Sequence, residues 1–224
     1  MQTNIIKSLE VARNSILKIE TWARSGPCEE NLMSCNNFAL FSTGSGAVVL
    51  YGNKKVVLTA AHVCKQEDAE MFGSKSEEGM LIKAIDRTDK EYYIEIIKFD
   101  TEADICLLRS RSGTLEPKYL KLSHKKPEYG EFVYNLSGPM GIIERDMVPV
   151  FQGQFFGILD GKAFYSIPVI GGSSGSPVVN FKGELIGMIH SVHYRFHHIS
   201  LSATYQRLWN FLKTEHNHTS QSQN

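Results

Sequence analysis

The sequence predicts an all-β fold built from many short strands, with one helix near each end. Between residues 37 and 203, short runs of β-branched, aromatic and other apolar residues alternate with turn residues. Regularly spaced short strands of this kind are typical of β-barrels and β-sandwiches. A chain of 224 residues is long enough for one large β domain or two small ones.

The expected strands form two groups that a polar stretch separates. The first group is Phe38–Phe41, Gly46–Tyr51, Lys55–Thr59, Met80–Ile85, Tyr92–Phe99 and Ile105–Arg109. The second group is Glu131–Leu136, Met147–Phe156, Ala163–Ile167, Ser176–Val179, Glu184–His190 and His198–Ser202. Within the first group, residues 51–54 are predicted to form a hairpin turn. The polar stretch Ser110–Pro117 marks a domain boundary, so we expect β domains at 37–115 and 116–214.

A helix is expected at each end of the chain. One apolar stripe is formed by Ile5, Leu9, Ala12, Ile16 and Ile19, which predicts an amphipathic helix of roughly five turns within residues 1–36. This helix could pack against the β domain, self-associate or bind a partner. Near the other end, Ser202 is a candidate N-cap for a short helix with Tyr205, Leu208, Trp209 and Leu212 on one face. Residues 215–224 are expected to be a flexible polar tail.

Composition and charge exclude several classes of partner. Twenty-four Lys and Arg residues balance twenty-four Asp and Glu residues, so neither nucleic acid nor an anionic membrane is expected. The longest apolar runs are too short to span a bilayer. Residues 1–10 lack the features of a secretory signal, and we therefore expect a cytoplasmic protein. The four cysteines, at positions 28, 35, 64 and 106, are accordingly expected to be reduced.

Three segments carry residue types that suit nucleophilic catalysis. The turn Gly172–Pro177 presents Ser174 between glycines, in front of a β-branched run. A serine hydroxyl is a poor nucleophile unless a base takes its proton and a further group orients that base. His62 follows one β-rich run, and Asp104 precedes another. Each residue alone is typical of a loop, surface or capping position, but together they form a candidate catalytic triad.

The segments around these residues resemble the trypsin/chymotrypsin superfamily of serine proteases, most closely its bacterial high-temperature-requirement branch. The similar strings are Gly44–Val49, Val57–Val63, Phe99–Leu108, Gly172–Asn180 and Gly183–Met188, within a likeness that covers residues 39 to 213. The resemblance implies two packed six-stranded Greek-key β-barrels, with His62 and Asp104 in the first and Ser174 in the second. It also implies a serine endopeptidase that acts on proteins or peptides without a metal or cofactor. The peptide-binding domain that often follows the protease in that branch is not expected here.

The resemblance assigns a role to each candidate residue. Asp104 would orient His62, and His62 would take the proton of Ser174 as the hydroxyl attacks a peptide carbonyl to form an acyl-enzyme. Backbone N–H groups of Gly172 and Ser174 would form the oxyanion hole. Ser174 matches the frame G-x-S-G-x-P, whereas Ser173 does not. Position 173 is Asp in trypsin-like zymogens and commonly Asn in the bacterial branch, so activation by an inserted N-terminus is not expected.

The same resemblance predicts where a substrate would lie. The expected substrate-binding residues are Ile170 and, on a strand that would pair with an extended peptide, His190, Ser191, Val192 and His193. The primary pocket would be walled by this strand and by residues near Ser166–Ile170 and Phe196–Ser200. No Asp or Glu occurs in these segments, so small or aliphatic side chains are predicted at P1. Acidic side chains are the alternative, because His190, His193 and Arg195 could supply positive charge.

Three other interpretations compete with the protease. Histidines 190, 193, 197 and 198 have spacings that could hold zinc, but strand alternation places them on both faces, so no metal site is predicted. A catalytically silent homologue could use the same surface to bind peptides, and Ser173 is the main observation in its favour. A serine esterase would share the chemistry, but its G-x-S-x-G turn belongs to a fold in which Ser precedes Asp and His.

Overall fold

The structure, a computed structural model, describes residues 2–24, 38–65 and 80–213. The strands of the first half are β1 (Ile16–Arg24), β2 (Phe38–Tyr51), β3 (Lys54–Thr59), β4 (Met80–Asp86), β5 (Glu91–Asp100) and β6 (Ile105–Ser110). Those of the second half are β7 (Phe132–Leu136), β8 (Val150–Leu159), β9 (Lys162–Tyr165), β10 (Pro177–Val179), β11 (Leu185–His193) and β12 (Phe196–Ala203). The helices are α1 (Gln2–Arg13), α2 (Ala61–Cys64), the 3₁₀ turn η3 (Pro139–Gly141) and α3 (Tyr205–Lys213).

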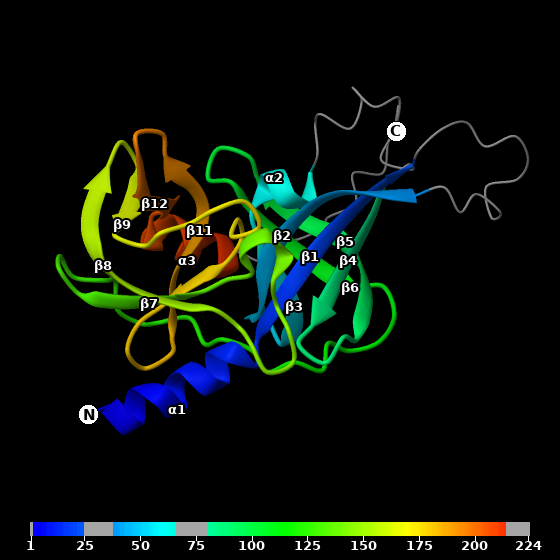
Figure 1. The fold of residues 1–224 in the computed structure, drawn as a ribbon, viewed down its shortest axis with the longest axis horizontal. Coiled ribbons are helices and arrows are strands. Elements are labelled where there is room, and N and C mark those ends of the chain that lie inside the picture. Colours follow the sequence, from blue (N-terminus) through cyan, green and yellow to red (C-terminus); the bar gives the residue numbers. More distant parts are fainter. Residues whose placement is uncertain (1, 25–37, 66–79, 214–224) are drawn as a thin grey trace, which may run out of the picture.

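The strands close into two barrels that lie side by side (Figure 1). Neighbouring strands follow the order β1-β2-β3-β6-β5-β4 in the first barrel and β10-β11-β12-β9-β8-β7 in the second. The predicted hairpin turn is confirmed, because Tyr51 of β2 pairs with Lys54 of β3 across a two-residue loop. Two six-stranded barrels with a helix near each end confirm the predicted fold class.

Apolar side chains fill the barrels and join them. The last four residues of β3 are buried, and Val57 and Leu58 have no exposed surface. Burying an aliphatic side chain of this size contributes about 1.5–3 kcal/mol to stability. The larger buried cluster continues from the first barrel to Leu136 of β7 and Val179 of β10. The two barrels therefore share a core at their interface, which fixes how residues from one barrel meet residues from the other.

The N-terminal helix is shorter than the sequence predicted. It ends at Arg13, whereas Ile16 and Ile19 belong to β1, which pairs with β2 on one side and β4 on the other. Both isoleucines are buried in the barrel. β-Branched side chains favour pleated, half-buried positions, and pairing with two neighbouring strands outweighs the helical spacing. The first barrel thus begins at Ile16 rather than at residue 37.

The remaining helix, α1, lies against the body of the protein. Ile5 and Leu9 are partly buried and pack against the larger core cluster, as the first of the alternatives for this helix expected. Ile6 and Val11 are exposed. Association of α1 with a second copy or a partner stays a prediction.

The C-terminal helix α3 is present as predicted, but its cap differs. The N–H of Arg207 donates to Thr204 Oγ1 at 3.3 Å, while Ser202, the expected cap, is buried in β12. Thr204 takes this place because β12 continues to Ala203, so the chain leaves the strand one residue later. Arg207 also reaches the first barrel, where its guanidinium lies 3.1 Å from the carboxylate of Asp100.

Some expectations concern residues outside the described ranges. Cys28, Cys35 and the tail at 215–224 lie there. Among the helices of the described ranges, none is both long enough and apolar enough to cross a membrane.

Candidate active site

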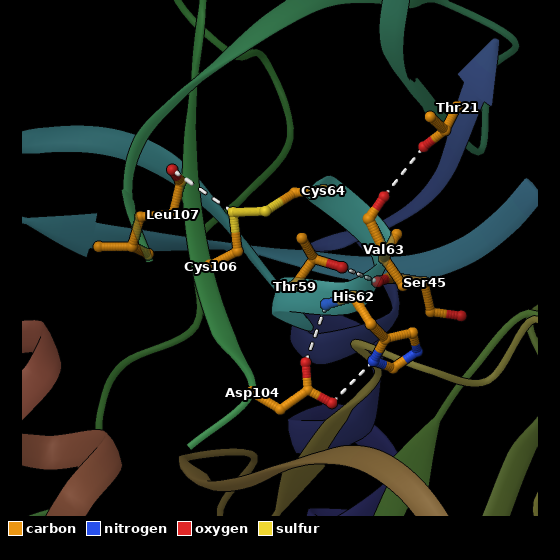
Figure 2. The surroundings of a disulfide bond; sticks show 9 residues. All are labelled: Thr21, Ser45, Thr59, His62, Val63, Cys64, Asp104, Cys106 and Leu107. Carbon is orange, nitrogen blue, oxygen red and sulfur yellow. Dashed lines mark hydrogen bonds and ion pairs between the residues drawn. A yellow bond between two sulfur atoms is a disulfide. The ribbon is translucent and has the colours of Figure 1, made fainter. Parts of the chain in front are cut away.

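Strand pairing brings His62 and Asp104 together. β3 and β6 are neighbours, with Thr59 opposite Cys106; His62 follows β3 on α2, and Asp104 immediately precedes β6. Asp104 Oδ2 lies 2.7 Å from His62 Nδ1, and Asp104 Oδ1 accepts a hydrogen bond of 2.9 Å from the backbone N–H of His62 (Figure 2). Two contacts to one carboxylate fix both the histidine backbone and its ring. The Asp104 backbone has a positive φ of 55°, a conformation uncommon outside glycine.

Asp104 is held in its ionised form. Burial alone would raise the pKa of this carboxyl, but hydrogen bonds from the ring and backbone of His62 hold its pKa below the ordinary value. An ionised Asp104 accepts a hydrogen bond from the His62 ring when Nδ1 carries the proton. The other ring nitrogen, Nε2, is then the one that can accept a proton from a nucleophile.

A disulfide bond lies directly beside this pair. Cys64 on α2 is bonded to Cys106 on β6 (Figure 2), and both residues are buried. The expectation that these two cysteines are reduced was therefore wrong. It rested on the apparent lack of a secretory signal, which says nothing about how close two cysteines lie, whereas pairing of β3 with β6 brings their segments together.

The turn that carries Ser174 is held against the segment that leads to His62. The Ser174 carbonyl accepts a hydrogen bond of 2.7 Å from the N–H of Ser45 on β2. Any side chain at Gly175 would collide with Ser45 and Thr59, because a Cβ there would lie 2.1 Å from the Ser45 carbonyl oxygen and 2.2 Å from Thr59 Oγ1. Ser174 Oγ donates to the carbonyl of His190 at 3.4 Å. Ser174 is partly exposed, whereas Ser173 is 2% exposed.

The glycine turn presents two backbone donors. The N–H of Ser173 donates to the carbonyl of Ile170, which closes a turn around Gly171 and Gly172. Gly172 has a φ of +91°, and a Cβ there would lie 2.6 Å from the backbone nitrogen of Met140, so only glycine suits this position. Because the carbonyl of Gly171 accepts from Met140 N–H at 2.7 Å, the N–H of Gly172, across the same trans peptide, points the other way. Among the described residues, neither Gly172 N–H nor Ser174 N–H has a hydrogen-bond acceptor.

Ser45 connects this turn to the first barrel, a role that the sequence did not reveal. Its side chain has no exposed surface. Ser45 Oγ donates to the carbonyl of Gly172 at 2.7 Å and accepts from the N–H of Gly138 at 2.9 Å. Its carbonyl accepts from Thr59 Oγ1 at 2.8 Å. Gly44-Ser45-Gly46 was noted only as part of the family resemblance, because a serine between glycines is ordinarily a loop residue.

The expected substrate-binding residues lie in different environments. Ile170 is 60% exposed at the start of the glycine turn, whereas His190 is 8% exposed. His190 Nδ1 lies 3.8 Å from Asp104 Oδ2 and 2.9 Å from Ser191 Oγ. Burial lowers the pKa of His190 to about 4 despite the opposing effect of the Asp104 charge. His190 is thus a neutral residue next to Asp104.

The end of β11 forms one arm of a hairpin with β12, and aromatic residues cluster at its turn. Ser191, Val192 and His193 are partly exposed on β11 and pair with β12. The His193 ring stacks on Tyr194, with ring centres 4.9 Å apart. Within residues 2–24, 38–65 and 80–213, no three His, Cys, Asp or Glu side chains are grouped closely enough to hold a metal ion.

Comparisons with known proteins identify the family and the fold of this chain. The sequence model of the trypsin-like peptidase domain matches residues 44–188, and no curated protein sequence matches the chain. In fold, the chain is similar to the serine endoprotease from Yersinia pestis, with a TM-score of 0.69 and 16% identity over 92% of this chain and 64% of that protein.

A second solved structure is similar in fold to a comparable degree. The active form of the Rv3671c protease from M. tuberculosis has a TM-score of 0.67 and 16% identity, over 93% of this chain and 85% of that one. The chain thus spans a little under two thirds of the Yersinia protein's length and most of the mycobacterial one's. Since the family model matches more than half of the sequence, the chain belongs to the trypsin-like peptidase domain family.

Proposed function

We propose that the protein is a serine endopeptidase that hydrolyses peptide bonds through His62, Asp104 and Ser174. The observation that carries this proposal is the 2.7 Å contact between Asp104 and His62, at the place where the Ser174 turn is held against Thr59 and Ala60. Membership of the trypsin-like peptidase domain family supports it. The partial exposure of Ser174, against the burial of Ser173, supports Ser174 as the nucleophile.

The proposed reaction needs only side chains and backbone groups of this chain. Nε2 of His62 takes the proton of Ser174 Oγ while the oxygen attacks the substrate carbonyl, and Asp104 stabilises the resulting imidazolium. The N–H groups of Gly172 and Ser174 stabilise the oxyanion, because they are already in place and have no other acceptor among the described residues. His62 then protonates the leaving amine, and water hydrolyses the acyl-enzyme. The substrates would be proteins or peptides.

A preference for small or aliphatic side chains at P1 is retained in this proposal. The alternative preference for acidic side chains needed positive charge from His190 and its neighbours. His190 is buried against Asp104, and its pKa is lowered to about 4, so it carries no charge near neutral pH. Of the three basic residues on which that alternative depends, Arg195 and His193, at the β11–β12 hairpin, are then the two that remain.

Covalent labelling tests the proposed nucleophile. A fluorophosphonate probe is expected to modify Ser174 in the wild type and in Ser173→Ala, and to leave Ser174→Ala unmodified, with the modified peptide identified by mass spectrometry. Circular dichroism would confirm that all three proteins are folded. Labelling of Ser173, or no labelling of the folded wild type, would contradict the proposal.

No labelling of the folded wild type would favour the catalytically silent homologue. The main support for that homologue is Ser173, which stands where related proteases have Asp or Asn. That homologue is expected to bind extended peptides along β11 without cleaving them. Incubation of the wild type with a peptide library separates the two functions, because only an endopeptidase produces new N-termini that disappear with Ser174→Ala.

A further inference from the structure

A second concave site lies between α1, the first barrel, the connection between the barrels and the second barrel. It is a cavity of about 600 Å³, and four separate segments of the chain line it. This volume is in the range of ordinary small-molecule sites, about 300–1,000 Å³. α1 and α2 lie on opposite sides of the molecule in Figure 1, so this cavity is away from His62 and its partners.

The lining of the cavity is strongly basic. Five lysines contribute to it: Lys7 from α1, Lys55 from β3, Lys118 and Lys121 from the connection, and Lys182 from the turn before β11. Glu184 is the single acidic lining residue, and its carboxylate accepts a hydrogen bond of 2.9 Å from the side chain of Asn180. The protein as a whole has no net charge. Five lysines against one glutamate in the lining of one cavity are therefore a local excess rather than a consequence of composition.

Like several other surface lysines, such as Lys125 and Lys126, the lysines of this cavity form no ion pair with a carboxylate of the described residues. Lys18 and Lys83 each lie 2.9 Å from a glutamate oxygen. In contrast, among residues that the structure describes, no carboxylate lies within 4 Å of the ammonium groups of Lys7, Lys118, Lys121 or Lys182. Several lysines in the lining of one cavity create a positive potential there, which attracts an anionic ligand.

Lys55 has a different role in the same wall. Its ammonium group donates to the carbonyls of Leu115, Glu116 and Pro117 at 3.0, 3.2 and 2.8 Å. It therefore holds the connection, which carries Lys118 and Lys121, against β3. Lys182 is held in a similar way, because its N–H donates to Asn180 Oδ1 at 2.9 Å. Two of the segments that bear lysines are thus fixed before any ligand binds.

We propose that this cavity binds a small soluble molecule that carries several phosphate groups. Lysine ammonium groups are compact charges with rotatable donors, which suit phosphate oxygens. Several phosphates on one molecule can contact lysines from separate segments at once, and Lys7, Lys121 and Lys182 come from α1, the connection and the second barrel. The aromatic ring of Tyr119 and the side chain of Val11 also line the cavity and offer an apolar surface to the rest of such a molecule.

Isothermal titration calorimetry on the full chain tests the proposal by measuring the binding of tripolyphosphate and ATP. Adenosine is the uncharged control. Both phosphate compounds are expected to bind at one site, with affinity that falls as sodium chloride is raised, and adenosine is expected not to bind. Tighter binding of ATP than of tripolyphosphate would identify a nucleotide, whereas equal binding would identify the phosphate chain alone as the ligand group. Both results support the site.

Matched variants locate the binding. Lys121→Gln combined with Lys182→Gln should weaken binding at least tenfold. Lys125→Gln combined with Lys126→Gln removes the same charge from exposed positions outside the cavity and should leave the affinity within twofold. Absence of saturable binding, or equal weakening by both pairs, would overturn the proposal. The readout is binding, so loss of peptidase activity in any protein would not affect the conclusion.

Discussion

Cys64 and Cys106 form a disulfide bond, and each of them lies two residues after one member of the His62–Asp104 pair. The bond therefore joins α2 to β6 at the place where the candidate base meets the carboxylate that orients it. Backbone pairing of β3 with β6 gives the same connection without the bond. We infer that the disulfide stabilises a geometry that the strands already define.

Loss of the disulfide should lower stability more than it alters the site. The bond closes a loop with a sequence separation of 42, and a loop of this length corresponds to about 3–4 kcal/mol of unfolding free energy. Urea unfolding of Cys64→Ala combined with Cys106→Ala, compared with the oxidised wild type, measures this loss. Two free thiols at these positions in the purified wild type, detected by mass spectrometry after alkylation, would contradict the bond itself.

Asp104→Asn should abolish most activity while the fold is retained. An amide cannot stabilise the imidazolium of His62 and favours the wrong tautomer, which lowers kcat by about 10⁴-fold in a comparable triad. Peptide hydrolysis by the variant measures the effect. Glu102→Gln is the matched control, because Glu102 lies two residues away and pairs with Arg207 instead. Similar losses in the two variants would argue against a special role for Asp104.

Ser45→Ala should lower kcat with little change in KM. Without the hydroxyl, the carbonyl of Gly172 and the N–H of Gly138 lose their partner, so the oxyanion donors are held less accurately. We expect kcat to fall by about 10- to 100-fold, less than the loss for removing such a donor outright. Ser15→Ala provides the control, since Ser15 is equally buried and bonds the carbonyl of Val11 at 3.0 Å. That variant should change stability alone, and an equal fall in kcat there would refute a positioning role for Ser45.

His190 should make stability depend on pH between about 4 and 6.5. Its folded-state pKa is lowered from 6.5 to about 4, so the unfolded chain binds more protons in this range and the free energy of unfolding decreases as the pH falls. The contribution amounts to about 3 kcal/mol. Urea unfolding at pH 7 and pH 4 should therefore show a smaller difference for His190→Asn than for the wild type. His124→Asn, at an exposed position, should retain the wild-type difference.

Most strands could be predicted from the sequence, because alternation of apolar residues is a short-range pattern. The motifs around the candidate residues could be recognised for the same reason. Alternating apolar residues identified most strands of both barrels, and the glycine turn indicated Ser174. The helical spacing at Ile16 and Ile19 was misleading, since two strands that lie later in the chain pair with this segment. Local periodicity cannot register such neighbours.

Features that depend on contacts between distant segments could not be predicted. Ser45 meets Gly172 across 127 residues of sequence, and the disulfide spans 42. The basic cavity combines lysines from four segments that lie far apart in the sequence, so no single segment indicates it. His190 was expected to face a substrate, but strand geometry buries it against Asp104.

Each terminal helix contacts the barrel that lies farther from it in the sequence. α1 precedes the first strand of the first barrel, yet the carbonyl of Ser8 lies so close to Gly183 of the second that a Cβ there would be 2.6 Å away. α3 follows the last strand of the second barrel, yet it contacts β5 of the first barrel. Arg207 of α3 bonds to Asp100, and Lys98 donates a hydrogen bond to the carbonyl of Phe211 in α3. Each half of the chain thus completes the other. The two barrels should therefore melt in one cooperative transition.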